Sequence, residues 1–151
     1  MPKKKKRKAP NWKKRADIVW SLIIRLKHGK CQICNKPGVM TKKGLPVGGL
    51  NAHHVIPRGN LKYRHDLRNG QCLCIGCHKF SRIRSPHAGN ITGVLAFAEW
   101  MQEDLPAQWA WYRENKSTRG KPELTFEEIC TDLKEKLEQK DFEIVYNDES
   151  K

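Results

Sequence analysis

The sequence predicts a small α+β domain: a zinc-stapled hairpin and helix with further helices on both sides. One observation is a repeated Cys-x2-Cys pair, at Cys31 and Cys34 and again at Cys74 and Cys77. A second is that two short segments with strand character, separated by a basic loop, lie between these pairs. A third is that helical periodicity precedes and follows this region. With 151 residues the chain is long enough for one domain with one modest core.

The charge is distributed unevenly along the chain. Residues 1–90 carry 22 Lys and Arg against Asp17 and Asp66, a formal charge of +20, whereas residues 91–151 carry 8 against 14 acidic residues, or −6. A basic half that contains the cysteine pairs indicates a polyanionic partner, with a merely solvated charged surface as the alternative.

Two classes of protein are excluded by the apolar pattern. The chain has no apolar run of eighteen residues and no apolar segment after its basic start, so we expect neither a membrane span nor a signal peptide. We therefore expect a cytoplasmic protein, and a nuclear one only if the basic block M-P-K-K-K-K-R-K at the N-terminus acts as an import signal. The same block could instead contact DNA or simply be solvated.

Residues 1–15 are predicted as a basic, disordered arm, residues 16–140 as the single domain and residues 141–151 as a tail. A helix is expected from Asn11 to Lys27, with Gly29 as its stop signal. Its apolar stripe, which we assign to the core, consists of Ala16, Val19, Trp20, Ile23 and Leu26.

The central region contains the predicted hairpin. A glycine-rich loop at 38–50 leads to a strand at 52–56, which Pro57 ends. A basic loop at 58–68 follows, and the second strand is expected at 71–73. A helix is expected to begin near His78.

Two Cys-x2-Cys pairs 40 residues apart, each on a turn, indicate one tetrahedral zinc site held by Cys31, Cys34, Cys74 and Cys77. Redox-active or unligated thiols are the alternative. Cys72 lacks the two-residue spacing to Cys77 and is expected to be left over.

Three helices are predicted between residues 90 and 140. Asn90 is expected to cap a helix that runs to about Glu103, and Pro106 suits the first turn of the next one. Thr125 and Glu128 have the spacing of a capping box for the last helix. On the first helix, one apolar face is expected from Ile91, Val94, Leu95, Ala98 and Met101.

The histidines suggest a second metal site. Adjacent strand residues point to opposite faces, so His53 and His54 cannot both bind one ion from a regular strand. A metal between His53 and His78 would leave His54 to accept a proton, with Asn69 as its orienting partner or as a loop-positioning residue. His28, His65 and His87 are predicted to be surface residues.

The run H-H-V-I-P, the later Asn69 and the ending C-x2-C-H resemble the HNH endonucleases and their ββα-metal finger. The resemblance implies a finger core at about 31–84, His54 as general base, Asn69 as the central asparagine, and cleavage that leaves 5′-phosphate and 3′-hydroxyl ends. It also implies His53 and His78 as ligands of the catalytic ion and the four paired cysteines as a structural zinc site.

A longer resemblance is to the NinG family of phage recombination proteins. It is carried by A-D-I-V-W-S-L-I-I-R, R-N-G-Q-C, Gly89-Asn90 and the final T-F-E-E-I. The chain departs from that family at His53 and His78, where NinG-like chains usually have Gly and Asn. This departure favours the general HNH pattern and weakens the transfer of a recombination role.

The resulting expectation is a metal-dependent HNH endonuclease of phage origin that cuts DNA, with structural Zn²⁺ and a catalytic Mg²⁺, Mn²⁺, Ni²⁺ or Zn²⁺. A non-catalytic zinc-containing DNA-binding protein and a nuclease for branched recombination intermediates are the alternatives. A homodimer is compatible with the sequence. The residues expected to contact DNA are Arg58, Lys62, Arg64, Arg68, Lys79 and Arg82.

Overall fold

A computed structural model gives the architecture of the chain and describes residues 7–146. Residues 1–6, the first part of the predicted basic arm, and residues 147–151 lie outside the described part, and the predicted domain boundaries stay predictions. The elements in chain order are α1 (Trp12–His28), β1 (Leu50–His54), η1 (Leu67–Asn69), β2 (Gly70–Cys74), η2 (Gly76–Phe80), α2 (Ile91–Asp104), α3 (Pro106–Asn115) and α4 (Phe126–Gln139).

Helix α1 is the predicted first helix, with capping residues at both ends. The Asn11 side chain accepts a hydrogen bond from the Lys14 N–H at 3.0 Å, and Gly29 ends the helix with φ of 64°. The buried stripe follows the prediction except at its end, where Ile24 rather than Leu26 is buried. One face of α1 therefore carries the main core of the domain.

The hairpin is an antiparallel pair in which His53 faces Gln71 and His54 faces Gly70. Strand β1 starts two residues earlier than predicted and ends at His54, and every residue of β2 is buried. A Cβ on Gly70 would lie 2.3 Å from the Ile24 side chain, so only glycine lets α1 approach this end of the sheet so closely.

The helix expected near His78 is reduced to one π-helical turn, η2. It ends where the Ser81 N–H donates to the Gly76 carbonyl at 2.8 Å. Together β1, β2 and η2 form the small ββα unit, in which the third element is a single short turn.

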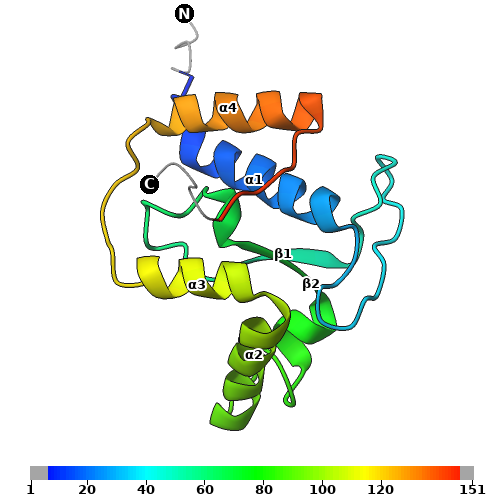
Figure 1. The fold of residues 1–151 in the computed structure, drawn as a ribbon. Helices are drawn as coiled ribbons and strands as arrows, with labels where there is room; N and C mark the ends of the chain where they lie inside the picture. The colour runs from blue at the N-terminus through cyan, green and yellow to red at the C-terminus, as the bar shows by residue number, and fades with distance from the viewer. Residues whose placement is uncertain (1–6, 147–151) are drawn as a thin grey trace, which may run out of the picture.

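The three C-terminal helices start at the predicted caps. The Asn90 side chain accepts from the Gly93 N–H at 2.8 Å, Pro106 is the first residue of α3, and Thr125 and Glu128 form the complete capping box of α4. Figure 1 shows α4 lying over α1 on one side of the hairpin and α3 on the other, with α2 projecting away from the body.

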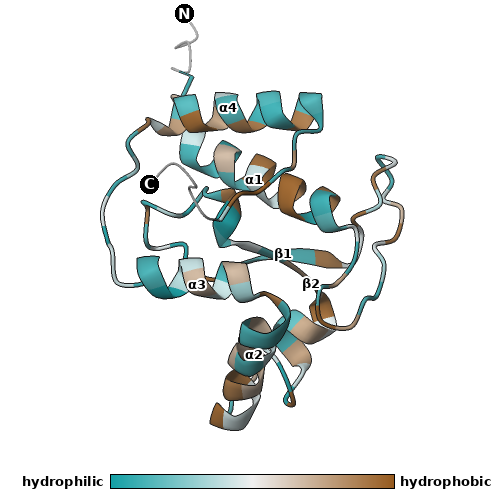
Figure 2. Cartoon of the chain, viewed as in Figure 1, coloured by the Kyte–Doolittle hydropathy of each residue, from teal (hydrophilic) through white to brown (hydrophobic). Residues whose placement is uncertain are grey.

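The predicted inner face of α2 is wrong in part. Ile91 and Leu95 are 71% and 54% exposed, whereas the residues of α2 that join the core are Phe97, Trp100 and Met101. The prediction failed because α2 is apolar on more than one face, so its periodicity cannot identify the buried one. In Figure 2 the hydrophobic colour accordingly extends to the end of α2 that points away from the body.

The fold class is confirmed: helices flank a two-stranded antiparallel sheet that carries a four-cysteine cluster, an arrangement consistent with an HNH ββα-metal fold. Cys130 and Leu133 of α4 are buried in the same core as α1. Among residues 7–146, none of the helices combines the length and apolar character needed to cross a membrane.

Candidate metal centres and active site

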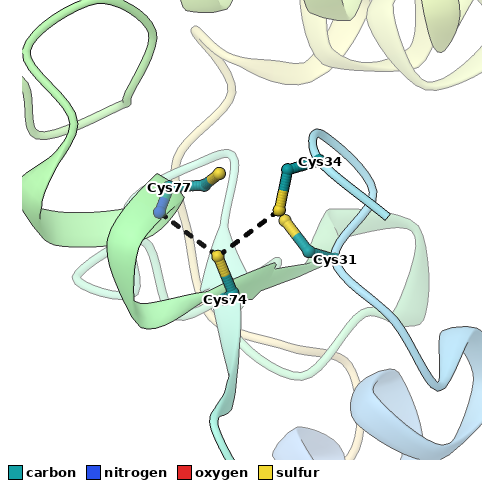
Figure 3. A group of neighbouring side chains, drawn as sticks. All are labelled: Cys31, Cys34, Cys74 and Cys77. Atoms are coloured by element: carbon teal, nitrogen blue, oxygen red, sulfur yellow. Dashed lines mark hydrogen bonds between the residues drawn. The ribbon is translucent and has the colours of Figure 1, made fainter. Parts of the chain in front are cut away.

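The two Cys-x2-Cys pairs meet in space. Cys31 and Cys34 lie on the turn after α1, Cys74 ends β2, and Cys77 lies in η2, and their four sulfur atoms lie within 4.8 Å of one another. Figure 3 shows the four side chains converging from these separate segments. The pairing that the spacing predicts is therefore present in the structure.

The spacing of the sulfur atoms fits a tetrahedral metal. The sulfur atoms of Cys34 and Cys74 are 3.7 Å apart. Four thiolates around zinc, each roughly 2.3 Å from the ion, would be separated by roughly 3.8 Å. The Cys77 N–H also donates to the Cys74 sulfur at 3.4 Å. Burial raises the pKa of the Cys74 thiol, but this bond and the neighbouring thiols outweigh it and lower the pKa, which favours the thiolate form.

Cys72 lies outside this cluster, as its spacing predicts. It is fully buried in β2, and burial raises its pKa to about 12. A buried thiol of this kind behaves as a small apolar residue of the core. The four paired cysteines could therefore hold a structural metal without it.

A second cluster consists of His53, His78 and His87, whose candidate ligand nitrogens all lie within 4.8 Å of one another. The ring centroids of His53 and His78 are 5.1 Å apart, and His87 lies 5.4 Å from the first and 5.1 Å from the second. These three rings come from β1, from η2 and from the loop that follows η2.

His87 lies at the surface, as predicted, but the sequence did not indicate that it has partners. Its side chain is exposed, but it completes the cluster with His53 and His78. The fourth residue after His78, where a helix would place another ligand, is Arg82, which cannot bind a cation. Because η2 ends after one turn, the chain doubles back and supplies His87 instead.

The cluster has the chemistry of a metal site. The Nδ1 atom of His78 is buried and has no hydrogen-bond partner among the described residues. Burial and the neighbouring histidines lower the pKa of His53 to about 3, and burial with His87 lowers that of His78 to about 4. Neutral imidazoles are the form that binds divalent cations, so the donor set fits such an ion.

His54 is oriented by two contacts on the other side of the strand. Its Nε2 lies 2.8 Å from the Arg64 carbonyl, which can only accept, so Nε2 carries the proton and Nδ1 is the free acceptor. Its ring stacks on Trp20 at a centroid distance of 3.9 Å. Burial lowers the pKa of His54 to about 4 despite the bond to Arg64, so the imidazole is neutral at pH 7.

Asn69 holds the loop that carries this carbonyl. Its side chain accepts from the Ile56 N–H at 2.6 Å and donates to the Ile56 and Tyr63 carbonyls at 2.9 and 3.0 Å. Of the two roles considered for Asn69, loop positioning fits these contacts, and the orienting partner of His54 is the Arg64 carbonyl.

Arg64 and His65 are both tied to helix α1 through Asp17. The Arg64 guanidinium donates to both carboxylate oxygens of Asp17 at 2.7 Å, and the Nε2 of His65 lies 2.7 Å from one of them. The prediction of His65 as a surface residue is wrong, because it is buried against this carboxylate, and His28 is half-buried.

A cleft of about 640 Å³ opens beside the histidines. His54 and the three clustered histidines line one part of it, together with Arg58, and apolar residues of α2 and α3 line the rest. Of the other predicted DNA contacts, Lys62, Lys79 and Arg82 are exposed. Arg64 and Arg68 use their guanidinium groups on Asp17 and Asp66, and their predicted contact with DNA stays a prediction.

Three residues of this site were not identified from the sequence. His87 is the next histidine after His78 in the sequence, so it is a candidate for the third ligand once η2 is known to be short. Trp20 was assigned to the core alone, and its contact with His54 has no local signal. Asp17 is one of only two acidic residues before residue 91, which marks it as a structural partner for nearby cations.

Comparison with known families places this site in context. A family model described as HNH endonuclease matches residues 31–80, about a third of the chain. That segment contains both cysteine pairs, the double histidine, Asn69 and His78, but it ends before His87. Searches of curated proteins and of solved structures returned no significant match. The likeness to NinG-type proteins is not confirmed by these comparisons and stays a prediction.

Proposed function

We propose that this protein is a metal-dependent endonuclease that hydrolyses phosphodiester bonds of DNA. The observation that carries the proposal is the placement of an oriented, neutral His54 in the same cleft as the cluster of His53, His78 and His87. The match of residues 31–80 to the HNH endonuclease family supports a nuclease-type function that acts on DNA.

His53, His78 and His87 would hold the catalytic ion, for which Mg²⁺, Mn²⁺, Ni²⁺ and Zn²⁺ are the candidates. When bound, a divalent cation there would supply Lewis-acid stabilisation of the scissile phosphate and of the leaving oxygen. The histidines contribute imidazole nitrogens from three separate segments, and the remaining coordination positions are left to solvent and substrate.

His54 would take the proton from the attacking water through Nδ1. The Arg64 carbonyl fixes the proton on Nε2, and the Trp20 ring restricts rotation of the imidazole. Asn69 and Asp17 act indirectly, because they hold the segment from Ile56 to Arg64 in place.

The four paired cysteines would hold a structural zinc that fixes η2 against the turn after α1. His78 follows Cys77 directly, so the structural metal would also position one ligand of the catalytic ion. Arg58, Lys62, Lys79 and Arg82 would contact phosphates of the substrate, consistent with the basic N-terminal half.

The test is nicking of supercoiled plasmid DNA by the purified full chain, with EDTA and then with each candidate cation. We expect nicking only with a divalent cation and ends that DNA ligase can reseal, as 5′-phosphate and 3′-hydroxyl ends require. His54→Ala should slow nicking by about 10²–10⁴-fold, whereas His28→Ala, which replaces a histidine outside the cluster, should not.

A protein that binds DNA but does not nick it with any cation would contradict the proposal and favour the non-catalytic DNA-binding alternative. A matched panel of linear, nicked and branched DNA then tests the alternative of a nuclease for recombination intermediates. Metal analysis adds a second readout, since the proposal predicts two metal sites per chain.

A further inference from the structure

The segment 79–86, which begins with the last two residues of η2 and continues as a loop, joins His78 to His87, two of the three histidines of the proposed catalytic centre. Near its middle, Ile83 is 84% exposed, the largest exposed fraction among the large hydrophobic side chains of the described residues. It lies between Arg82 and Arg84, which are also exposed. The loop leaves the body beside α2, at the end of the molecule away from α1 and α4 (Figure 1).

This loop is held at its base by internal hydrogen bonds. The buried Ser85 hydroxyl donates to the His78 carbonyl at 2.9 Å and accepts from the His87 N–H at 3.2 Å. Ser81 accepts from the Arg84 N–H at 3.2 Å. The same bonds that bring the two histidines together therefore also fix the position of the loop.

Helix α2 holds the tip from the other side. The Asn90 side chain donates to the Arg82 carbonyl at 3.1 Å, and a Cβ on Gly93 would lie 2.4 Å from that oxygen. Gly93 thus permits the close approach of the loop to α2. The exposed Ile83 is consequently presented from an anchored loop beside the proposed catalytic centre.

The residues around Ile83 indicate the chemistry of its partner. The guanidinium groups of Arg82 and Arg84 form no ion pair with any residue between 7 and 146, so both are available to an external anion. An apolar side chain between two cations is complementary to a DNA duplex. The duplex has phosphates on its outside and apolar base faces inside. Proteins that kink DNA insert isoleucine, leucine or phenylalanine side chains between base steps in this way.

We propose that Ile83 is a wedge that enters the base stack beside the cut, while Arg82 and Arg84 neutralise the flanking phosphates. This inference rests on the proposed function, since it assumes that the His53, His78 and His87 centre acts on DNA. It assigns a substrate preference to the enzyme. Duplexes that open easily, at TA and CA/TG steps or at mismatches, are better substrates than stiff A-tracts, because unstacking them costs less.

The first experiment compares cleavage of matched duplexes that carry a TA step, a mismatch or an A-tract at the same position. Wild-type protein should prefer the flexible sites, and Ile83→Ala should reduce the preference for the TA step over the A-tract by about tenfold, because it slows cleavage at the intact TA step. The mismatch, already unstacked, should be cut at nearly the wild-type rate. Ile18→Ala is the matched control, since Ile18 is a 59% exposed isoleucine on α1.

The second experiment measures unstacking without cleavage. His54→Ala protein, at concentrations that saturate binding by anisotropy, should raise the fluorescence of 2-aminopurine at the TA step, and the added Ile83→Ala substitution should remove that rise. Equal fluorescence with and without Ile83, or an effect of Ile83→Ala on dimerisation alone, would overturn the wedge and leave the proposed function standing. Absence of both DNA binding and cleavage in the wild-type protein would instead overturn the proposed function.

Discussion

Replacement of Asn69 tests how the fold supports the proposed base. The Asn69 side chain is 1% exposed and makes three hydrogen bonds, to the Ile56 N–H, the Ile56 carbonyl and the Tyr63 carbonyl. Asn69→Ala leaves all three backbone groups without this partner. At about 1 kcal/mol for each, the free energy of unfolding should fall by about 3 kcal/mol. Because small domains are stable by roughly 5–15 kcal/mol, the variant should still fold.

Asn69→Asp should cost more although it preserves the size of the side chain. The aspartate loses both N–H donors and places a second oxygen against the carbonyls of Ile56 and Tyr63. It also places a charge in a buried position, which costs desolvation free energy. The order of stability should therefore be wild type, then Asn69→Ala, then Asn69→Asp.

Urea denaturation of zinc-loaded protein measures this order. With a slope of about 1–3 kcal/mol per molar urea, the midpoint of Asn69→Ala should fall by roughly 1–3 M. Asn60→Ala is the control: its amide makes one hydrogen bond, to the Thr118 carbonyl at 2.7 Å, so it should lose only about 1 kcal/mol.

Nicking activity provides the second readout for Asn69. The segment that it holds carries the Arg64 carbonyl, which orients His54, so Asn69→Ala should slow nicking even under conditions in which it is fully folded. Asn60→Ala should nick at the wild-type rate. An Asn69→Ala protein with wild-type stability and wild-type nicking would refute the reasoning.

Three further predictions follow from the metal cluster, the Asp17 network and the basic terminus. Cys74→Ser should lose tightly bound zinc and lower the melting temperature, whereas Cys72→Ser should keep the zinc; the reverse result would refute the ligand assignment. Burial raises the pKa of Asp17, but the hydrogen bonds from Arg64 and His65 outweigh it and lower the pKa from 3.8, so its stabilisation is present above that value and is lost as pH falls through the lowered pKa. The Asp17→Asn protein should therefore be less stable than wild type at pH 7 and should lose less stability on acidification. An equal loss of stability in the two proteins as the pH falls would contradict this. Deletion of residues 2–8, most of which lie outside the described part, should flatten the slope of log affinity against log salt by roughly 0.9 for each lost phosphate contact; an unchanged slope would mean that the arm does not touch DNA.

Local signals predicted much of this architecture. The Asn90 and Thr125 caps act within one helical turn, so their helices begin where the sequence indicates. The Cys-x2-Cys pairs behave similarly, because two-residue spacing already places both thiols on one turn. The divergence of His53 and His54 also follows from strand geometry: the first meets His78, and the second stacks on Trp20.

Features that depend on tertiary packing were missed. His87 joins its cluster because η2 ends after one turn and Ser85 bonds back to the His78 carbonyl, and neither event has a strong sequence signal. The sequence predicts the exposed face of α2 to point inward, because Ile91 and Leu95 are as apolar as the residues that are buried. The stacking of Trp20 on His54 requires α1 to approach the sheet closely, which Gly70 permits.

The central claim is that one histidine handles the proton while three others hold the ion. Nicking rate measured against metal concentration for His54→Ala, His53→Ala and His87→Ala tests it most directly. His53→Ala and His87→Ala should need more metal and recover part of their activity when it is supplied. His54→Ala should be slower by about 10²–10⁴-fold at every metal concentration, because a lost general base is not replaced by a cation. Recovery of His54→Ala by added metal, or a His87→Ala protein with wild-type metal dependence, would contradict the account.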